Sequence, residues 1–230
     1  SPPFMNFSSS KLLMIAGVVG LILVIGIFRE TARALAARAF GASAGPLGGA
    51  VSLNPLTRLS FFGGLVVPFV AMYLIGWPIG GPSRAAFDEN SVGPLKAAVI
   101  AVASLVGIAV AGFLIAFACA YGLAHGWIDD VDRLKAPAYR ILTWGVWWAA
   151  YDLLIELLPI PPAAGSRVVG MFLPASVRRI YYKIEPVGGI LIILVVLWAV
   201  GYLGQRIPSL GPGYAREFRD GQERLFDQVD

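Results

Sequence analysis

Two long apolar stretches constrain this chain more than any other feature of its sequence. Leu12–Phe28 and Leu95–Leu123 carry almost no charge, and roughly 20 apolar residues are enough for a helix to cross a bilayer. The 230 residues are 57% hydrophobic and only 14% charged, whereas about one residue in four is charged in a soluble domain. We therefore expect an all-α integral membrane protein.

The hydropathy pattern predicts about four transmembrane helices. A third span is expected over Tyr139–Leu158 and a fourth over Ile184–Leu203. Phe61–Trp77 is apolar but short, and Gly and Pro interrupt it, so hydropathy leaves open whether it is a kinked span or a re-entrant segment. We expect one membrane domain over residues 1–204 and a polar tail over residues 205–230.

The first predicted helix continues beyond its apolar part. The residues that follow, RETARALAARAF, are mainly Ala and Arg, which are both good helix formers. Gly41 comes directly afterwards and is typical of the residue that ends a helix in a left-handed conformation. The helix is therefore expected to extend to Gly41, with Arg29 and Arg33 in its charged part.

The charge distribution predicts the orientation of the chain, because Lys and Arg gather in cytoplasmic loops. The loop before the third span carries Asp129, Asp130 and Asp132 and is expected outside. Basic residues follow the first and third spans instead: Arg29, Arg33, Arg38, Arg58, Arg167, Arg178, Arg179 and Lys183. This pattern fits only if Phe61–Trp77 does not cross the membrane, so we favour a re-entrant segment there. The N-terminus and the C-terminal tail are then expected outside, and the membrane is expected to be a bacterial inner membrane.

The remaining features favour structural roles over cofactor or nucleic-acid binding. The net charge is +4, but no Lys/Arg-rich run or RNA-binding motif is present, so we expect no nucleic-acid partner. His125 is expected to cap a loop or to lie at the membrane interface rather than to bind a pigment or haem, and Cys119 is expected to pack in an apolar run. An interfacial belt is expected from Trp144, Trp147 and Trp148. We expect no cofactor.

The expected partners are membrane lipids and other integral-membrane subunits. Arg178, Arg179 and Lys183 are candidates for contacts with lipid head groups, although orientation of the chain is the favoured explanation of these charges.

Four blocks of the sequence resemble, in the same order, the site-2 protease family of intramembrane zinc metalloproteases. FRETARALAARAFG resembles the family's HExxH helix, and VSLNPLTRLSFFGGLVVP resembles its LNPLxHxDxxGxLxxP segment. GWPIGGPS is similar to GWAKPVPV, and LLPIPPAAGSRVV is similar to LLPIPPLDGGRIL. The blocks extend from about Phe28 to Val169, so the resemblance implies a site-2-protease-like core.

The same resemblance implies that the catalytic residues are replaced. It places the two zinc-binding His of HExxH at Arg29 and Arg33, the general base at Glu30, and the third ligand, an Asp, at Ala164. The His and Asp of the second block correspond to Arg58 and Ser60. Because catalytic zinc takes three ligands from His, Cys or carboxylate, we expect no metal and no catalysis.

Charged residues could pair across the former site. Asp152 and Glu156 are four residues apart and share a helix face, and the family packs this helix beside the HExxH helix. The resemblance thus implies that the two arginines approach the two carboxylates, and we expect an ion-pair cluster of Arg29, Arg33, Glu30, Asp152 and Glu156. The alternative is that the arginines extend to cytoplasmic water while the two carboxylates of the third span face a partner.

These observations favour a non-catalytic pseudoprotease that serves as an accessory subunit of a larger membrane complex. A regulatory pseudoprotease, which binds membrane-helix clients without cleaving them, is the first alternative. An active intramembrane metalloprotease is the second, and the ligand positions disfavour it.

Overall fold

The computed structural model describes residues 9–42, 65–66, 68–70, 91–128, 136–185, 187–192 and 194. Its helices, in chain order, are α1 (Ser9–Ala39), α3 (Pro94–Ala124), α4 (Pro137–Glu156), α5 (Ala164–Phe172) and α6 (Ala175–Lys183). The chain is all-helical over the described residues. Arg58, Ser60, the tail from residue 205, and most of Phe61–Trp77 and of the predicted fourth span lie outside them.

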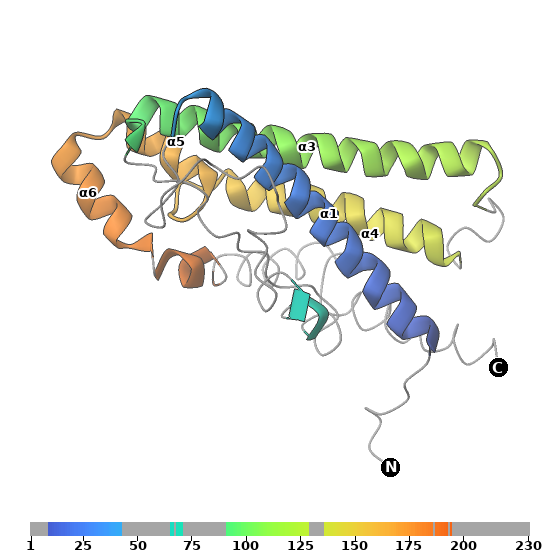
Figure 1. Cartoon of the computed structure of the whole chain (residues 1–230). Helices are drawn as coiled ribbons and strands as arrows, with labels where there is room; N and C mark the ends of the chain where they lie inside the picture. Colours follow the sequence, from blue (N-terminus) through green and yellow to red (C-terminus); the bar gives the residue numbers. More distant parts are fainter. Residues whose placement is uncertain are drawn as a thin grey trace, which may run out of the picture.

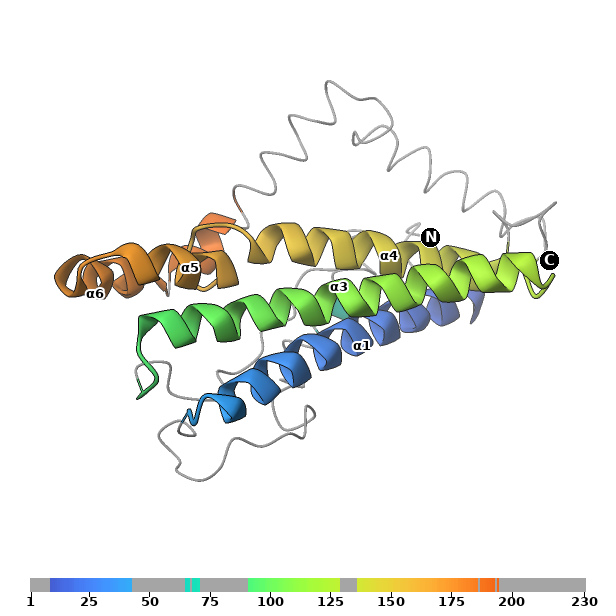
Figure 2. The same ribbon diagram turned by 90° about the horizontal axis from the view of Figure 1, so that it is seen from above.

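The three long helices lie side by side (Figures 1 and 2). α1 packs against α3 and α4, and α3 also packs against α4 and α5. α3 runs antiparallel to α1 and α4, so the C-terminal ends of α1 and α4 lie at the same end of the bundle as the start of α3. α5 and α6 lie at this end too.

The charged end of α1 finishes as the sequence predicts. Gly41 has φ +70°, a left-handed conformation that costs Gly little. The amide of Ala42 donates to Ala37 O at 2.9 Å, and the amide of Gly41 donates to Arg38 O at 3.1 Å. This pair of bonds is the Schellman motif, and it confirms the predicted end of the helix.

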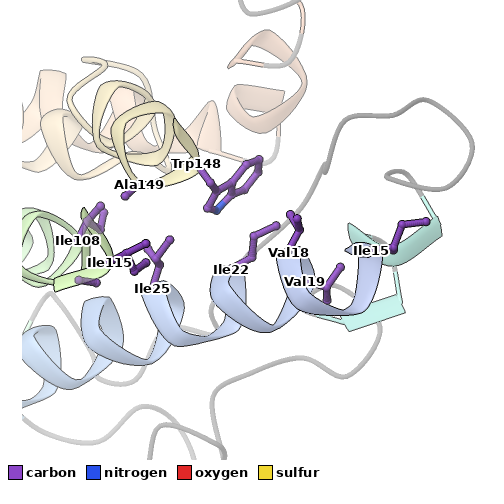
Figure 3. Packing of buried hydrophobic residues seen from close by; sticks show 10 residues of the cluster. Ile15, Val18, Val19, Ile22, Ile25, Ile108, Ile115, Trp148 and Ala149 are labelled. Atoms are coloured by element: carbon purple, nitrogen blue, oxygen red, sulfur yellow. The ribbon is translucent and has the colours of Figure 1, made fainter. Parts of the chain in front are cut away.

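The largest cluster of buried apolar residues joins the three long helices. Val18, Ile22 and Ile25 of α1 meet Ile108 of α3 and Trp148 of α4 (Figure 3). Trp148 is only 6% exposed, whereas Trp147 is 62% exposed. The expectation that Trp148 belongs to an interfacial belt with Trp144 and Trp147 is therefore wrong. Trp148 points into the bundle because it lies on the face of α4 that packs on α1 and α3.

Glycine permits the close approach of α1 and α3. A Cβ atom added to Gly107 of α3 would lie 2.6 Å from Phe28 O and 3.0 Å from Arg29 Cα, both on the backbone of α1. Small residues at such crossings are typical of helices that pack within a membrane. The crossing point is also where the apolar part of α1 ends and its charged part begins with Arg29 and Glu30.

Two of the described helices are long and apolar enough to cross a membrane, namely Leu12–Ala39 and α3. α4 covers the third predicted span as a helix of 20 residues but is not among these two. The coarse prediction of an all-helical membrane protein agrees with these two helices, and the finer prediction of about four spans stays a prediction.

Candidate functional site

Arg29 lies at the centre of a cluster of carboxylates. Its Nη1 is 3.2 Å from Asp152 Oδ1, 3.3 Å from Asp152 Oδ2 and 3.4 Å from Glu156 Oε1. Its Nε is 3.4 Å from Glu30 Oε1. One guanidinium group therefore contacts three carboxylates, of which Glu30 lies beside it on α1 and the other two belong to α4.

The cluster is largely shielded from solvent. Arg29 is 8% exposed and Glu30 is fully buried, while the side chains of Asp152 and Glu156 are 15% and 21% exposed. Ionised groups at low exposure are costly unless they are paired. The mutual pairing of these groups is the physical reason that they can be charged here.

Helix packing determines which residues enter the cluster. Glu30, Ala34 and Ala37 are buried, and the two alanines contact Ile100 of α3. These three positions follow the three- and four-residue spacing of one helix face, so the alanine-rich part of α1 packs on α3. With this face of α1 turned to α3, the side chain of Arg29 extends toward α4, where Asp152 and Glu156 lie one turn apart.

Glu156 connects this cluster to α5. Its Oε2 accepts a hydrogen bond of 2.7 Å from the backbone N–H of Ala164, the first residue of α5. The first N–H groups of a helix have no partner within the helix and favour negative charge. Glu156 thus satisfies the start of α5 with one oxygen and contacts Arg29 with the other.

The structure therefore brings together Arg29, Glu30, Asp152, Glu156 and the backbone of Ala164. Arg33 follows one turn after Arg29 on α1, with a half-buried side chain. The other basic candidates, Arg178, Arg179 and Lys183, all belong to α6 and are separate from this site.

These residues do not fit a catalytic zinc ion. Such an ion takes three protein ligands and leaves one position open, but Arg29 and Arg33 supply cationic donors and Ala164 has no ligating atom in its side chain. Glu30, Asp152 and Glu156 are carboxylates, yet each lies within 3.4 Å of the Arg29 guanidinium. Among the residues that the structure describes, no three His, Cys, Asp or Glu side chains form a group that could hold a metal ion.

His125 lies at the opposite end of the bundle, where it follows the last turn of α3. Its Nδ1 is 3.0 Å from Tyr121 O, and its ring stacks on that of Tyr121 with the centroids 3.9 Å apart. His125 therefore caps the end of α3, in agreement with the first of the two structural roles expected for it. Cys119 is half-buried on the same helix.

The comparisons with known proteins support one part of the resemblance. The chain is 28% identical over 215 residues, 90% of this chain and 90% of the other, to a Bacillus subtilis (strain 168) protein named "Putative zinc metalloprotease YwhC". The similarity is weak, but it covers nearly the whole chain. It is consistent with a site-2-protease-like family and, with the two apolar helices, indicates a membrane protein. No family model and no solved structure matches the chain.

Three contacts around the site have no counterpart in the sequence analysis. The backbone N–H of Ala164 donates the hydrogen bond to Glu156, so the type of side chain at position 164 does not predict it. The approach of Gly107 to α1 depends on which face of α3 is turned inward. Arg167 of α5 is 3.3 Å from Glu185, which follows α6, and no spacing within one helix predicts a contact between separate helices. Of these three contacts, only the close approach of α3 to α1 has a signal in the sequence, namely a glycine at position 107 within a predicted helix.

Proposed function

We propose that this chain is a non-catalytic relative of the site-2 proteases and acts as an accessory subunit of a larger integral-membrane complex. The observation that carries the proposal is the ion pairing of Arg29 with Glu30, Asp152 and Glu156. An arginine at the position of the first zinc ligand is thus held by the carboxylates that surround it.

Loss of metal chemistry follows from charge and donor type. A divalent cation next to Arg29 would be repelled by the guanidinium group, and it would have to displace that group from its carboxylates. Glu30 occupies the position of the general base, but a general base needs a reactive water, which zinc activates in HExxH enzymes. The proposed cluster instead stabilises the packing of α1 on α4, and Glu156 extends it to the start of α5.

The accessory role is supported by what the chain presents to its surroundings. α3 exposes large apolar side chains along one face, among them Val99, Val106, Val110 and Phe113. In a membrane such a face contacts lipid or neighbouring helices. A chain whose fold persists without a reactive centre, and whose outer face is apolar, is suited to assembly with other membrane subunits.

Two measurements test the proposal. Purification in a mild detergent is expected to recover fixed stoichiometric amounts of other membrane proteins. Metal analysis of the purified chain is expected to find far less than one zinc ion per chain. One tightly held zinc ion, or cleavage of a membrane-helix substrate that is lost in Glu30→Gln, would establish the active protease instead.

A second candidate function, client binding without cleavage, is favoured by one groove. A cavity of about 410 Å³ lies between α1 and a segment that contains Leu65, and its lining is apolar: Ala16, Val19, Gly20, Leu23, Leu65, Val66 and Phe69. A photoreactive residue at Leu23 should crosslink varied membrane-helix clients if this function holds, whereas one at Val106 on α3 serves as the control. Crosslinks to one constant subunit from both positions would support the accessory role.

A further inference from the structure

α6 is held to the rest of the chain by its two tyrosines. Tyr181 Oη donates to the carbonyl of Pro159, and Tyr182 Oη donates to Ser166 O at 3.4 Å. The guanidinium of Arg167 lies 4.2 Å from the centre of the Tyr182 ring, and it also contacts Glu185 at 3.3 Å. These contacts fix which side of α6 is turned toward the bundle.

The other side of α6 presents two adjoining stripes. Val177 and Ile180 on the helix, with Ile184 directly after it, form an apolar stripe and are 47%, 65% and 41% exposed. Arg179 and Lys183, one turn apart, form an exposed basic stripe. At 100° per residue these two stripes are neighbours on the helix surface. No residue of α6 is buried.

The position of α6 relates these stripes to the membrane. α6 lies at the end of the bundle where α1 finishes and α3 begins (Figures 1 and 2). Its nine residues are about 14 Å long, which is too short to cross a hydrocarbon core of about 30 Å. An apolar stripe at this location, next to a basic one, is the arrangement of a helix that lies in the interface.

The charge of this surface selects the ligand. Glu185, the nearest acidic residue that follows α6, is already paired with Arg167. The outward cations, Arg179 and Lys183, are therefore presented to an external anion beside side chains that prefer hydrocarbon. Only an anionic phospholipid supplies a phosphate group and acyl chains at the same place.

We propose that α6 lies in the plane of the membrane and binds anionic phospholipid. Arg179 and Lys183 contact the phosphate groups, while Val177, Ile180 and Ile184 enter the boundary of the acyl chains. This surface differs from the sequence-based candidate trio, because Arg178 is half-buried on the side of α6 away from the apolar stripe. The proposal does not depend on whether the chain is catalytic.

Native mass spectrometry of the full chain, supplied with equal phosphatidylglycerol and phosphatidylcholine, tests the basic stripe. The double variant Arg179→Gln/Lys183→Gln should retain phosphatidylglycerol about thirtyfold less well, with phosphatidylcholine unchanged. The matched control is Arg38→Gln/Lys96→Gln, which removes two exposed cations from the same end of the bundle. An equal loss in both double variants would show nonspecific charge attraction and overturn the proposal.

Depth-dependent fluorescence quenching in lipid nanodiscs tests the apolar stripe. With Cys119 replaced by Ser, a label at Ile180→Cys should be quenched by probes in the acyl region, and a label at Ala175→Cys should face water. A water-accessible label at position 180 would overturn the proposal. So would a label that becomes protected only when a co-purifying protein is added, because α6 would then be a protein-binding surface.

Discussion

Glu156 accepts a hydrogen bond of 2.7 Å from the backbone N–H of Ala164. The other oxygen of the same carboxylate contacts Arg29. One side chain of α4 thus connects α1 to the start of α5, and it links the two residues that the resemblance to the site-2 proteases places at the first and third zinc ligands.

Substitution of Glu156 should separate its two roles. Glu156→Gln keeps an oxygen for the Ala164 N–H but removes the charge that Arg29 contacts, so a loss of about 1–2 kcal/mol in the unfolding free energy is expected. Glu156→Ala removes both and should cost about 2–4 kcal/mol. Unfolding titrations in SDS measure both. Equal losses for the two variants would mean that the bond to Ala164 contributes nothing.

Arg29 should be the most sensitive position of the cluster. Arg29→Met leaves three carboxylates without their shared cation and should lower the unfolding free energy by about 3–5 kcal/mol. Arg29→Lys keeps the positive charge, but a single ammonium nitrogen cannot contact Glu30 and the carboxylates of α4 through separate nitrogens. A loss smaller than that of Arg29→Met is therefore expected. Arg38→Met, at an exposed position of the last turn of α1, is the control. If Arg29→Met loses no more stability than Arg38→Met, the alternative in which the arginines extend to cytoplasmic water would be supported.

Gly107 should tolerate no side chain. Gly107→Ala would place a Cβ atom 2.6 Å from Phe28 O, and backbone cannot yield as a flexible side chain can. Displacement of α1 from α3 should cost about 1–3 kcal/mol and should weaken the Arg29 cluster at the same time. Gly20→Ala is the control, since nothing lies within 4 Å of a Cβ atom there, and thermal unfolding in detergent compares the two. Unchanged stability of Gly107→Ala would contradict the close crossing.

The two neighbouring tryptophans of α4 should differ in their effect on stability. Trp148→Ala removes a side chain that is 6% exposed and packs among residues of all three long helices, so a loss of about 3 kcal/mol is expected. Trp147→Ala changes a side chain that is 62% exposed and should have little effect. The SDS unfolding midpoint distinguishes the variants. Similar losses at both positions would indicate that Trp147 is covered by a partner.

The local features of the chain were accessible from its sequence. Apolar runs predict α1 and α3 because a helix that satisfies its own backbone is one of the few structures that can cross a bilayer. Gly41 predicts the end of α1 because the left-handed conformation costs Gly least among the residues. The break between α4 and α5 follows from the prolines that lie between Leu158 and Ala163.

The candidate site was accessible only in part. The four-residue spacing of Asp152 and Glu156 places both carboxylates on one face, and the resemblance suggests that this face is turned toward α1. Neither observation indicates that Glu156 also binds the backbone of α5. The inward position of Trp148 does not follow from the sequence, because clustering with Trp144 and Trp147 favours an interfacial place, whereas Trp148 lies past the middle of α4.

The sequence by itself determined that this chain is helical, that it is apolar enough to enter a membrane, and that imidazole ligands are missing where its resemblance expects them. Only the tertiary structure decided that Arg29 meets Glu30, Asp152 and Glu156, and that α6 turns its apolar and basic stripes outward. The physical reason is that hydrogen bonding and hydropathy along the chain determine where a helix forms. Contacts between α1, α4 and α5 depend instead on how closely their backbones approach and on which faces they turn inward.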